Sequence, residues 1–240
     1  MMDVATSSEG NISGFIPPTP EHYVLGGVYA LISVLGMAGN FLVILAVWRH
    51  RSLQNSTNAF IVNLAFADLL TSALLPIYVA SFWTTTYTSS MDSFCALSTG
   101  LLRAFVSCST LSLAAISINR LVIVTQAKRT YRWLFTRRRI VYSIFVMWIY
   151  GILLSFSTHF TGFVRLGFDV TIHQCGVVPI SPDSLAIGHG SHSIGTFPLQ
   201  FFIVLVCYAW IYLFVFRHNR RMQKHAESEP AGAISGAGGS

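Results

Sequence analysis

The fold of this protein is decided by residues 94–126, FCALSTGLLRAFVSCSTLSLAAISINRLVIVTQ. Apart from Arg103, this stretch carries no charged side chain before Arg120. It is long and apolar enough to cross the hydrocarbon core of a bilayer as one helix, which needs about 20 residues. We therefore expect a membrane-spanning helix with Cys95 near one end and Arg120 near the other.

The whole chain has the composition of a membrane protein. Of its 240 residues, 53% are hydrophobic and 10% are charged, which is too apolar for an ordinary soluble domain. Its apolar segments lack the strict alternation of barrel strands, so they predict an all-α, multi-pass membrane helix bundle. The expected helices cover approximately residues 23–48, 58–83, 94–125, 140–164 and 194–217. Residues 218–240 are expected to form a disordered tail.

The basic residues indicate how the helices are oriented. Most Lys and Arg residues fall in three clusters beside apolar segments, around Arg49 and Arg51, at 128–139 and at 217–224. Such clusters stay on the cytoplasmic side of the plasma membrane. We therefore expect the tail of residues 1–22 to be extracellular and the carboxyl terminus to be cytoplasmic. Because the basic residues flank apolar segments, the net charge of +6 does not indicate that the protein binds nucleic acid. Asn11 begins a glycosylation sequon in the outside tail.

Several motifs, in order, resemble rhodopsin-like (class A) G protein-coupled receptors, whose third helix carries a cysteine at its outer end and an arginine at its inner end. Here Cys95 and Arg120 are 25 positions apart. Further matches are Gly39-Asn40, Leu64 to Asp68, Asn119, Trp148 and Cys175. An Asn at position 119, where the family usually has an acid, is similar to the melatonin receptors and their orphan relatives. The resemblance covers five of the seven transmembrane helices, and we expect helices six and seven to be missing from this chain.

The resemblance implies a role for each matched residue. Cys95 and Cys175 would form a disulfide, since both face the oxidising compartment. Asn119, Arg120 and Leu121 would form the switch that contacts a heterotrimeric G protein. An amide at position 119 offers Arg120 a hydrogen bond rather than a charge pair, so the switch should be weakly restrained.

A second implied site is a sodium pocket formed by Asn40, Asp68 and Ser109. Oxygen ligands of this kind suit a hard cation. The pocket would be incomplete, because the family takes its remaining ligands from the seventh helix. A carboxylate at mid-membrane is costly, so Asp68 must face the bundle interior; the alternative is that Asp68 is only a neutral, hydrogen-bonded group.

The expected ligand pocket contains Leu102 and Arg103. Leu102 stands where amine receptors carry an aspartate, which argues against a biogenic amine. Arg103 lies eight residues after Cys95, about two helical turns into the membrane, where its charge needs an anion or water. Our hypothesis is that Arg103 receives an anionic group of a small-molecule or peptide ligand. The alternative is that it snorkels outward or pairs with Asp169 or Asp183.

Other functions have weaker support. No nucleophile–base–acid set, phosphate loop or paired carboxylates occur, so we expect no enzyme and no cofactor. His189 and His192 are too weak a pair to predict a metal site. The alternatives that remain are a non-signalling truncated receptor acting as a dominant-negative partner, and a transporter or channel fragment, although no repeat is visible. The expected partners are a G protein, a ligand, membrane lipid and a second receptor in a dimer.

Overall fold

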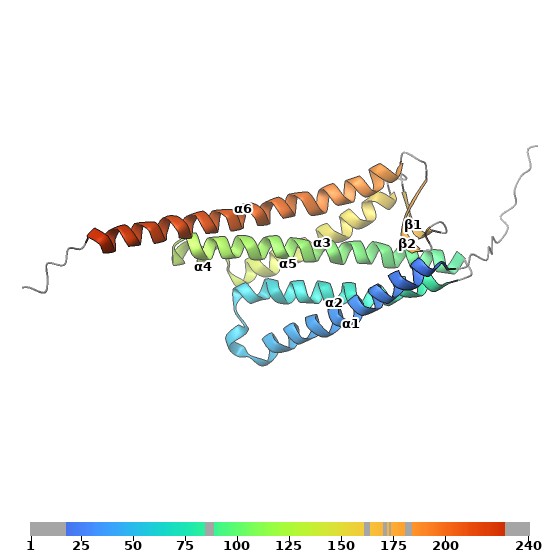
Figure 1. The fold of residues 1–240 in the computed structure, drawn as a ribbon, viewed down its shortest axis with the longest axis horizontal. Helices are drawn as coiled ribbons and strands as arrows, with labels where there is room; N and C mark the ends of the chain where they lie inside the picture. The colour runs from blue at the N-terminus through green and yellow to red at the C-terminus, as the bar shows by residue number, and fades with distance from the viewer. Residues whose placement is uncertain are drawn as a thin grey trace, which may run out of the picture.

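We describe the protein from a computed structural model, which covers residues 18–84, 89–160, 164–169, 172, 174–180 and 184–228. The elements in order are α1 (Pro20–Arg49), η1 (Arg51–Leu53), α2 (Ser56–Trp83), α3 (Ser89–Thr125), α4 (Lys128–Leu134), α5 (Arg137–Phe160), β1 (Val164–Asp169), β2 (Gln174–Pro179) and α6 (Ser184–Ser228). The long helices lie side by side, and β1 and β2 cross one end of them (Figure 1). We call this the hairpin end, and the opposite end, with η1 and α4, the basic end.

In the part of the chain that the structure describes, five helices are long and apolar enough to cross a membrane. The segments are Pro20–Arg49, Thr57–Trp83, Ser90–Thr125, Arg137–Ser157 and Phe197–Lys224. The predicted all-α, multi-pass bundle is therefore confirmed. The first three helices begin a few residues earlier than the sequence predicts, because polar residues such as Ser89 and Ser90 extend their first turns.

The last two helices differ from the prediction. α5 ends at Phe160 rather than near 164, and Val164 already belongs to β1. α6 covers 45 residues instead of 194–217, so residues 218–228 are helical rather than part of a disordered tail. A helix of this length extends roughly 68 Å, about twice the thickness of the hydrocarbon core. The basic stretch after Phe216 continues the helix because Arg, Lys, Gln and Met are good helix formers.

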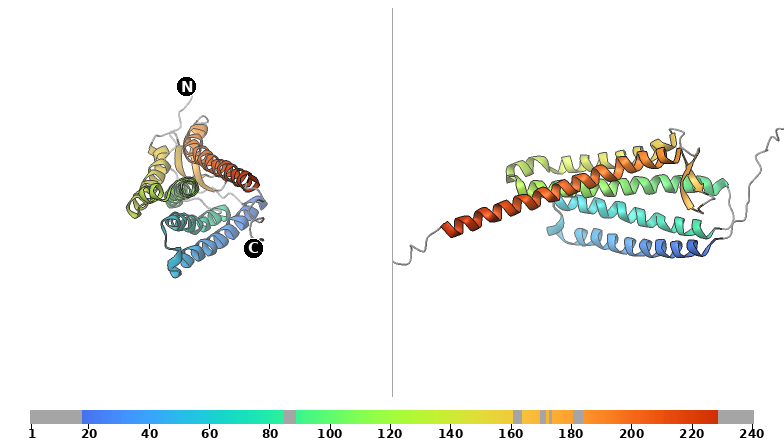
Figure 2. Two further views of the ribbon diagram at one scale, coloured as in Figure 1. Left: turned by 90° about the vertical axis from the view of Figure 1, so that its left-hand side faces the viewer. Right: turned by 45° about the horizontal axis from the view of Figure 1, so that its top comes forward.

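α3 is the central helix of the bundle. It contacts α2, α5, α6 and both strands, and the end-on view in Figure 2 places it among the other helices. Its approach to α5 is close at one point, where a Cβ added to Gly151 would lie 2.9 Å from the carbonyl oxygen of Ala104. Small residues at helix contacts allow this packing in membrane bundles.

α1 packs on α2 through small side chains. The Ser33 hydroxyl donates a hydrogen bond of 2.8 Å to the carbonyl oxygen of Ser72, and Gly36 lies directly against the Ser72 side chain. A Cβ at Gly36 would overlap the Ser72 hydroxyl oxygen, so only glycine fits at this contact. The pair of helices flanks α3 and completes one wall of the bundle (Figure 2).

Candidate functional site

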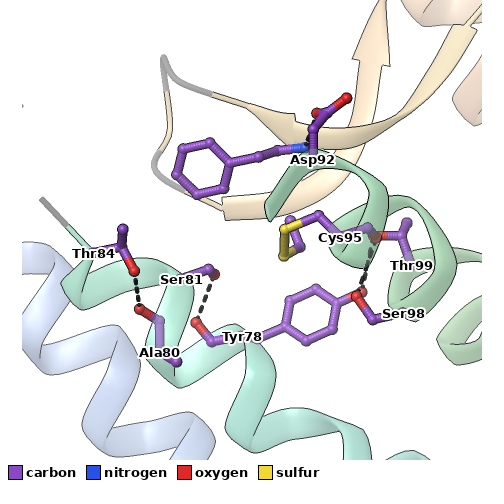
Figure 3. Close-up of a disulfide and its surroundings, with 10 residues drawn as sticks. Tyr78, Ala80, Ser81, Thr84, Asp92, Cys95, Ser98 and Thr99 are labelled. Atoms are coloured by element: carbon purple, nitrogen blue, oxygen red, sulfur yellow. Dashed lines mark hydrogen bonds between the residues drawn. A yellow bond between two sulfur atoms is a disulfide. The ribbon is translucent and has the colours of Figure 1, made fainter. Parts of the chain in front are cut away.

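The hairpin end is closed by two antiparallel strands that a disulfide attaches to α3. In the register of β1 and β2, Phe168 lies opposite Cys175. Cys175 is joined to Cys95 in the second turn of α3, which is the disulfide that the family resemblance implies (Figure 3). The hairpin therefore lies over the end of the bundle rather than extending away from it.

A second attachment of the hairpin comes from Asp92. Its carboxylate accepts a hydrogen bond of 2.9 Å from the backbone N–H of Phe168 and also pairs with the guanidinium of Arg165. Asp92 and Cys95 are three positions apart, so both project from the same face of α3. Each strand is thus tied to one helical turn, β1 through Asp92 and β2 through Cys95.

Beneath the hairpin is a small apolar cluster. Its buried members are Tyr78, Cys95, Phe168 and Cys175, and Leu102 packs against them. The Tyr78 hydroxyl donates a hydrogen bond of 3.2 Å to the hydroxyl of Thr99, so the phenol ring lies between α2 and α3 next to the disulfide (Figure 3). Leu102, a predicted pocket residue, therefore packs against the apolar cluster beneath the hairpin.

Arg103 is half-buried, and part of its guanidinium is shielded from solvent. Its Nε and Nη2 atoms are buried and make no hydrogen bond to any residue that the structure describes. The ion pair on the hairpin joins Arg165 to Asp92, and Arg103 itself forms none within the described residues. Its guanidinium lies near Tyr78. Of the two acids proposed as its alternative partners, Asp183 lies outside the described residues.

Midway along the bundle, one asparagine connects three helices. The Asn63 amide donates a hydrogen bond of 2.8 Å to the hydroxyl of Ser112, and its carbonyl oxygen accepts one of 3.0 Å from the indole N–H of Trp148. Asn63 is 7% exposed, so these bonds form away from lipid. They join α2 to α3 and to α5, which gives the Trp148 of the family motif a structural partner.

The three residues of the implied sodium pocket are not joined to one another by hydrogen bonds within the described residues. The Asn40 amide donates to the carbonyl oxygen of Gly36 on its own helix, at 2.9 Å. Asp68 is half-buried and lies near enough to Cys108 on α3 for an electrostatic interaction, and Ser109 is buried. The sodium pocket remains a prediction.

At the basic end, the residues of the expected switch face different environments. Asn119 is fully buried, and neither polar atom of its amide has a hydrogen-bond partner in the described part of the chain. Arg120 is exposed, and Leu121 is half-buried. The expected hydrogen bond between Asn119 and Arg120 is therefore absent from the described structure, because adjacent helical residues point in different directions.

Three of the residues considered from the sequence have side chains that the structure does not describe, and three residues that connect structural elements had no predicted role. Asn11 lies outside the described residues, as do the side chains of His189 and His192 on α6. Sequence reasoning did not assign roles to Asn63, Asp92 or Tyr78. The i, i+3 spacing of Asp92 and Cys95 was a usable signal, because it places the carboxylate on the same helical face as the disulfide.

Comparison with known proteins identifies the family. The sequence profile of the family 7 transmembrane receptor (rhodopsin family) matches residues 39–233. The chain belongs to the rhodopsin family of seven-transmembrane receptors. This receptor chain is 28% identical over 203 residues to the G-protein coupled receptor moody of Drosophila pseudoobscura pseudoobscura, covering 83% of its own length and 29% of that protein.

Two other relatives agree. The receptor chain is 29% identical to Melanopsin-A of Danio rerio, covering 91% of the chain and 35% of the relative. It is 31% identical to the human Alpha-1A adrenergic receptor, covering 89% of the chain and 45% of the relative. The chain thus spans less than half the length of these curated relatives, all of which are receptors rather than enzymes. The more specific similarity to melatonin receptors remains a prediction.

The fold is shared with a solved receptor structure. Squid rhodopsin aligns with a TM-score of 0.71 at 22% sequence identity, over 92% of this receptor chain and 66% of the squid protein. At this level of identity the similarity concerns the fold alone. It agrees with the bundle of membrane-length helices described above.

Proposed function

We propose that this chain forms the ligand-binding and G protein-facing helices of a plasma-membrane receptor. The observation that carries the proposal is on α3: in the half nearer the hairpin, Arg103 has buried Nε and Nη2 atoms without a hydrogen-bond partner among the described residues, and near the other end Arg120 is exposed. Arg103 would sense a ligand, and Arg120 would contact a G protein. A single helix would then connect the two sites.

The hairpin end would face the outside of the cell. The basic end carries the Lys and Arg residues of α4 and of the start of α5, and such residues stay on the cytoplasmic side. This orientation puts the Cys95–Cys175 disulfide in an oxidising compartment, where such bonds persist. It also puts Asn11 where it can be glycosylated.

An anionic ligand would neutralise Arg103. A buried charge without a counterion is costly, and a carboxylate or phosphate can accept charge-assisted hydrogen bonds from both Nε and Nη2. Tyr78 of α2 and Leu102, which pack together beneath the hairpin, would supply apolar contacts near Arg103. The ligand would therefore have an acidic group attached to an apolar body.

A matched pair of compound libraries tests this ligand class. Cells that express the receptor are treated with apolar carboxylic acids and, in parallel, with their methyl esters, and G protein dissociation is recorded by energy transfer. We expect responses to acids whose esters are inactive, and loss of those responses in Arg103→Gln. Arg165→Gln is the control, because it removes a positive charge from the exposed hairpin. Equal responses to acids and esters, or unchanged potency in Arg103→Gln, would reject the anionic ligand.

The cytoplasmic role of Arg120 is tested separately. Its guanidinium is exposed at the end of α3 next to a buried Asn119 that does not hold it, so we expect measurable G protein coupling without ligand. Arg120→Ala should remove this basal coupling while surface expression stays constant. Arg49→Ala, an exposed charge at the basic end of α1, should leave coupling unchanged. Full basal coupling in Arg120→Ala would contradict the assignment of Arg120.

A further inference from the structure

A groove outside the proposed ligand pocket lies at the basic end of the bundle, between α3 and α5. Its volume is about 290 Å³, and its walls include Phe60, Ile118, Leu134, Phe135 and Ile140. Ile118 is 41% exposed and belongs to the membrane-spanning part of α3, so the groove opens toward lipid. An apolar groove at this position can receive a hydrocarbon chain.

Among the described residues, the one charged side chain that lines the groove is that of Arg139. Its guanidinium stacks over the Trp133 ring at 4.1 Å from the ring centroid and donates a hydrogen bond to the carbonyl oxygen of Trp133. These two contacts with α4 fix the guanidinium at the groove and leave its other N–H groups available. Arg139 is thus positioned to bind an anion rather than free to move through solvent.

Among the side chains that the structure describes, no acid lines the groove or forms an ion pair with Arg139. The acidic residues of the described chain are Glu21, Asp68, Asp92, Asp169 and Glu227, and none of them is among the residues that line the groove. Arg137, Arg138 and Arg139 are consecutive and exposed in the first turn of α5. Trp133 is 63% exposed beside them, and exposed tryptophans of membrane proteins concentrate at the level of the lipid headgroups.

We propose that this groove binds one anionic phospholipid from the leaflet that the basic end faces. Arg139 would bind the phosphate of the headgroup, and the first part of one acyl chain would lie against Ile118, Phe135 and Ile140. The lipid is favoured over a soluble anion because the groove walls are apolar and open to the bilayer. It is favoured over an uncharged lipid because the only charged group at the groove is a cation.

Native mass spectrometry of the detergent-purified chain tests the proposal. Phosphatidylserine and phosphatidylcholine with identical acyl chains are titrated separately, and the stoichiometry and apparent affinity of bound lipid are compared. We expect one retained phosphatidylserine with an affinity about tenfold above that of phosphatidylcholine, the effect of one charge-assisted interaction. Equal affinities for the two lipids would overturn the proposal.

Two variants and a matched control separate the site from a general effect of charge. Arg139→Gln should lower the affinity for phosphatidylserine about tenfold, to that of the uncharged lipid. Ile118→Trp keeps every charge but fills the groove from a lipid-exposed position, and should cause a similar loss. Arg138→Gln removes the same charge from a neighbouring residue that does not line the groove, and should have little effect. A loss in Arg138→Gln as large as in Arg139→Gln, or full binding in Ile118→Trp, would show that net charge rather than the groove retains the lipid.

A soluble competitor distinguishes the lipid from its headgroup. Glycerophosphoserine carries the same phosphate without acyl chains and should not displace phosphatidylserine at equal concentration. Displacement would mean that the groove is an anion site with no preference for lipid, which would also overturn the proposal.

Discussion

The indole N–H of Trp148 donates a hydrogen bond of 3.0 Å to the side-chain carbonyl oxygen of Asn63, 85 positions earlier in the chain. The same amide donates to Ser112, so α2, α3 and α5 meet at one polar side chain. In a bundle that packs mainly through apolar side chains, hydrogen bonds between helices help to fix which helices are neighbours. Asn63 therefore acts as a structural centre of the receptor.

Replacing Asn63 should destabilise the bundle. Asn63→Ala removes bonds to two helices and leaves the Trp148 N–H unpaired, so we expect the free energy of unfolding to fall by about 1–3 kcal/mol. Thermal denaturation of the purified chain in detergent measures the effect. Asn40→Ala is the control, because the Asn40 amide bonds only to its own helix at Gly36. An equal loss in both variants would contradict the connecting role of Asn63.

The two attachments made by Asp92 should differ in strength. Arg165 is 44% exposed, so its ion pair with Asp92 is screened by water, and Arg165→Gln should cost less than about 1 kcal/mol. Asp92→Ala also removes the acceptor of the Phe168 N–H, and should destabilise the hairpin by about 1–3 kcal/mol. Hydrogen exchange at the Phe168 amide reports this directly. Faster exchange in Arg165→Gln than in Asp92→Ala would reverse the ranking.

Gly151 should tolerate no side chain. In Gly151→Ala the new methyl group meets the backbone carbonyl of Ala104 at 2.9 Å, and a backbone atom cannot move aside as a flexible side chain can. We expect α3 and α5 to separate, with a loss of about 1–3 kcal/mol in stability. Gly39→Ala is the matched control, since nothing lies within 4 Å of a Cβ at that position. Melting temperatures that are equal for the two variants would rule out the close contact.

The buried amide of Asn119 should be replaceable by an apolar group. Neither of its polar atoms has a partner among the described residues, so the amide is desolvated without compensation. Asn119→Leu removes that cost and should raise the melting temperature, corresponding to about 1–3 kcal/mol. A lower melting temperature would mean that the amide has a polar partner in the membrane. Basal coupling, measured in parallel, shows whether Arg120 responds to the change.

Much of the bundle follows from the sequence, because long apolar segments between basic clusters allow few alternatives in a membrane. Cys95, Cys175 and Trp148 were located by the family motifs, and the structure gives each a bonding partner. The ends of α6 were not predicted. Hydropathy detects where a helix crosses lipid, and it carries no signal for helical turns that continue into water on either side.

The polar contacts between helices were also not predictable from one sequence. That Asn63 meets Ser112 depends on the rotation of α2 against α3, and apolar periodicity fixes rotation poorly when lipid surrounds the bundle. The isolation of Asn119 from Arg120 has a simpler cause. Neighbouring helical residues point about 100° apart, so a hydrogen bond between their side chains was not to be expected from proximity in sequence alone.

The double attachment of the hairpin has a consequence for the kinetics of the receptor. Asp92 and Cys95 belong to one turn of α3, so both strands are anchored to that helix at neighbouring points. A compound bound beneath the strands would then leave between helices rather than by displacing the strands. The residence time of such a compound would depend on how often the helices separate. Reducing the disulfide would shorten this residence time.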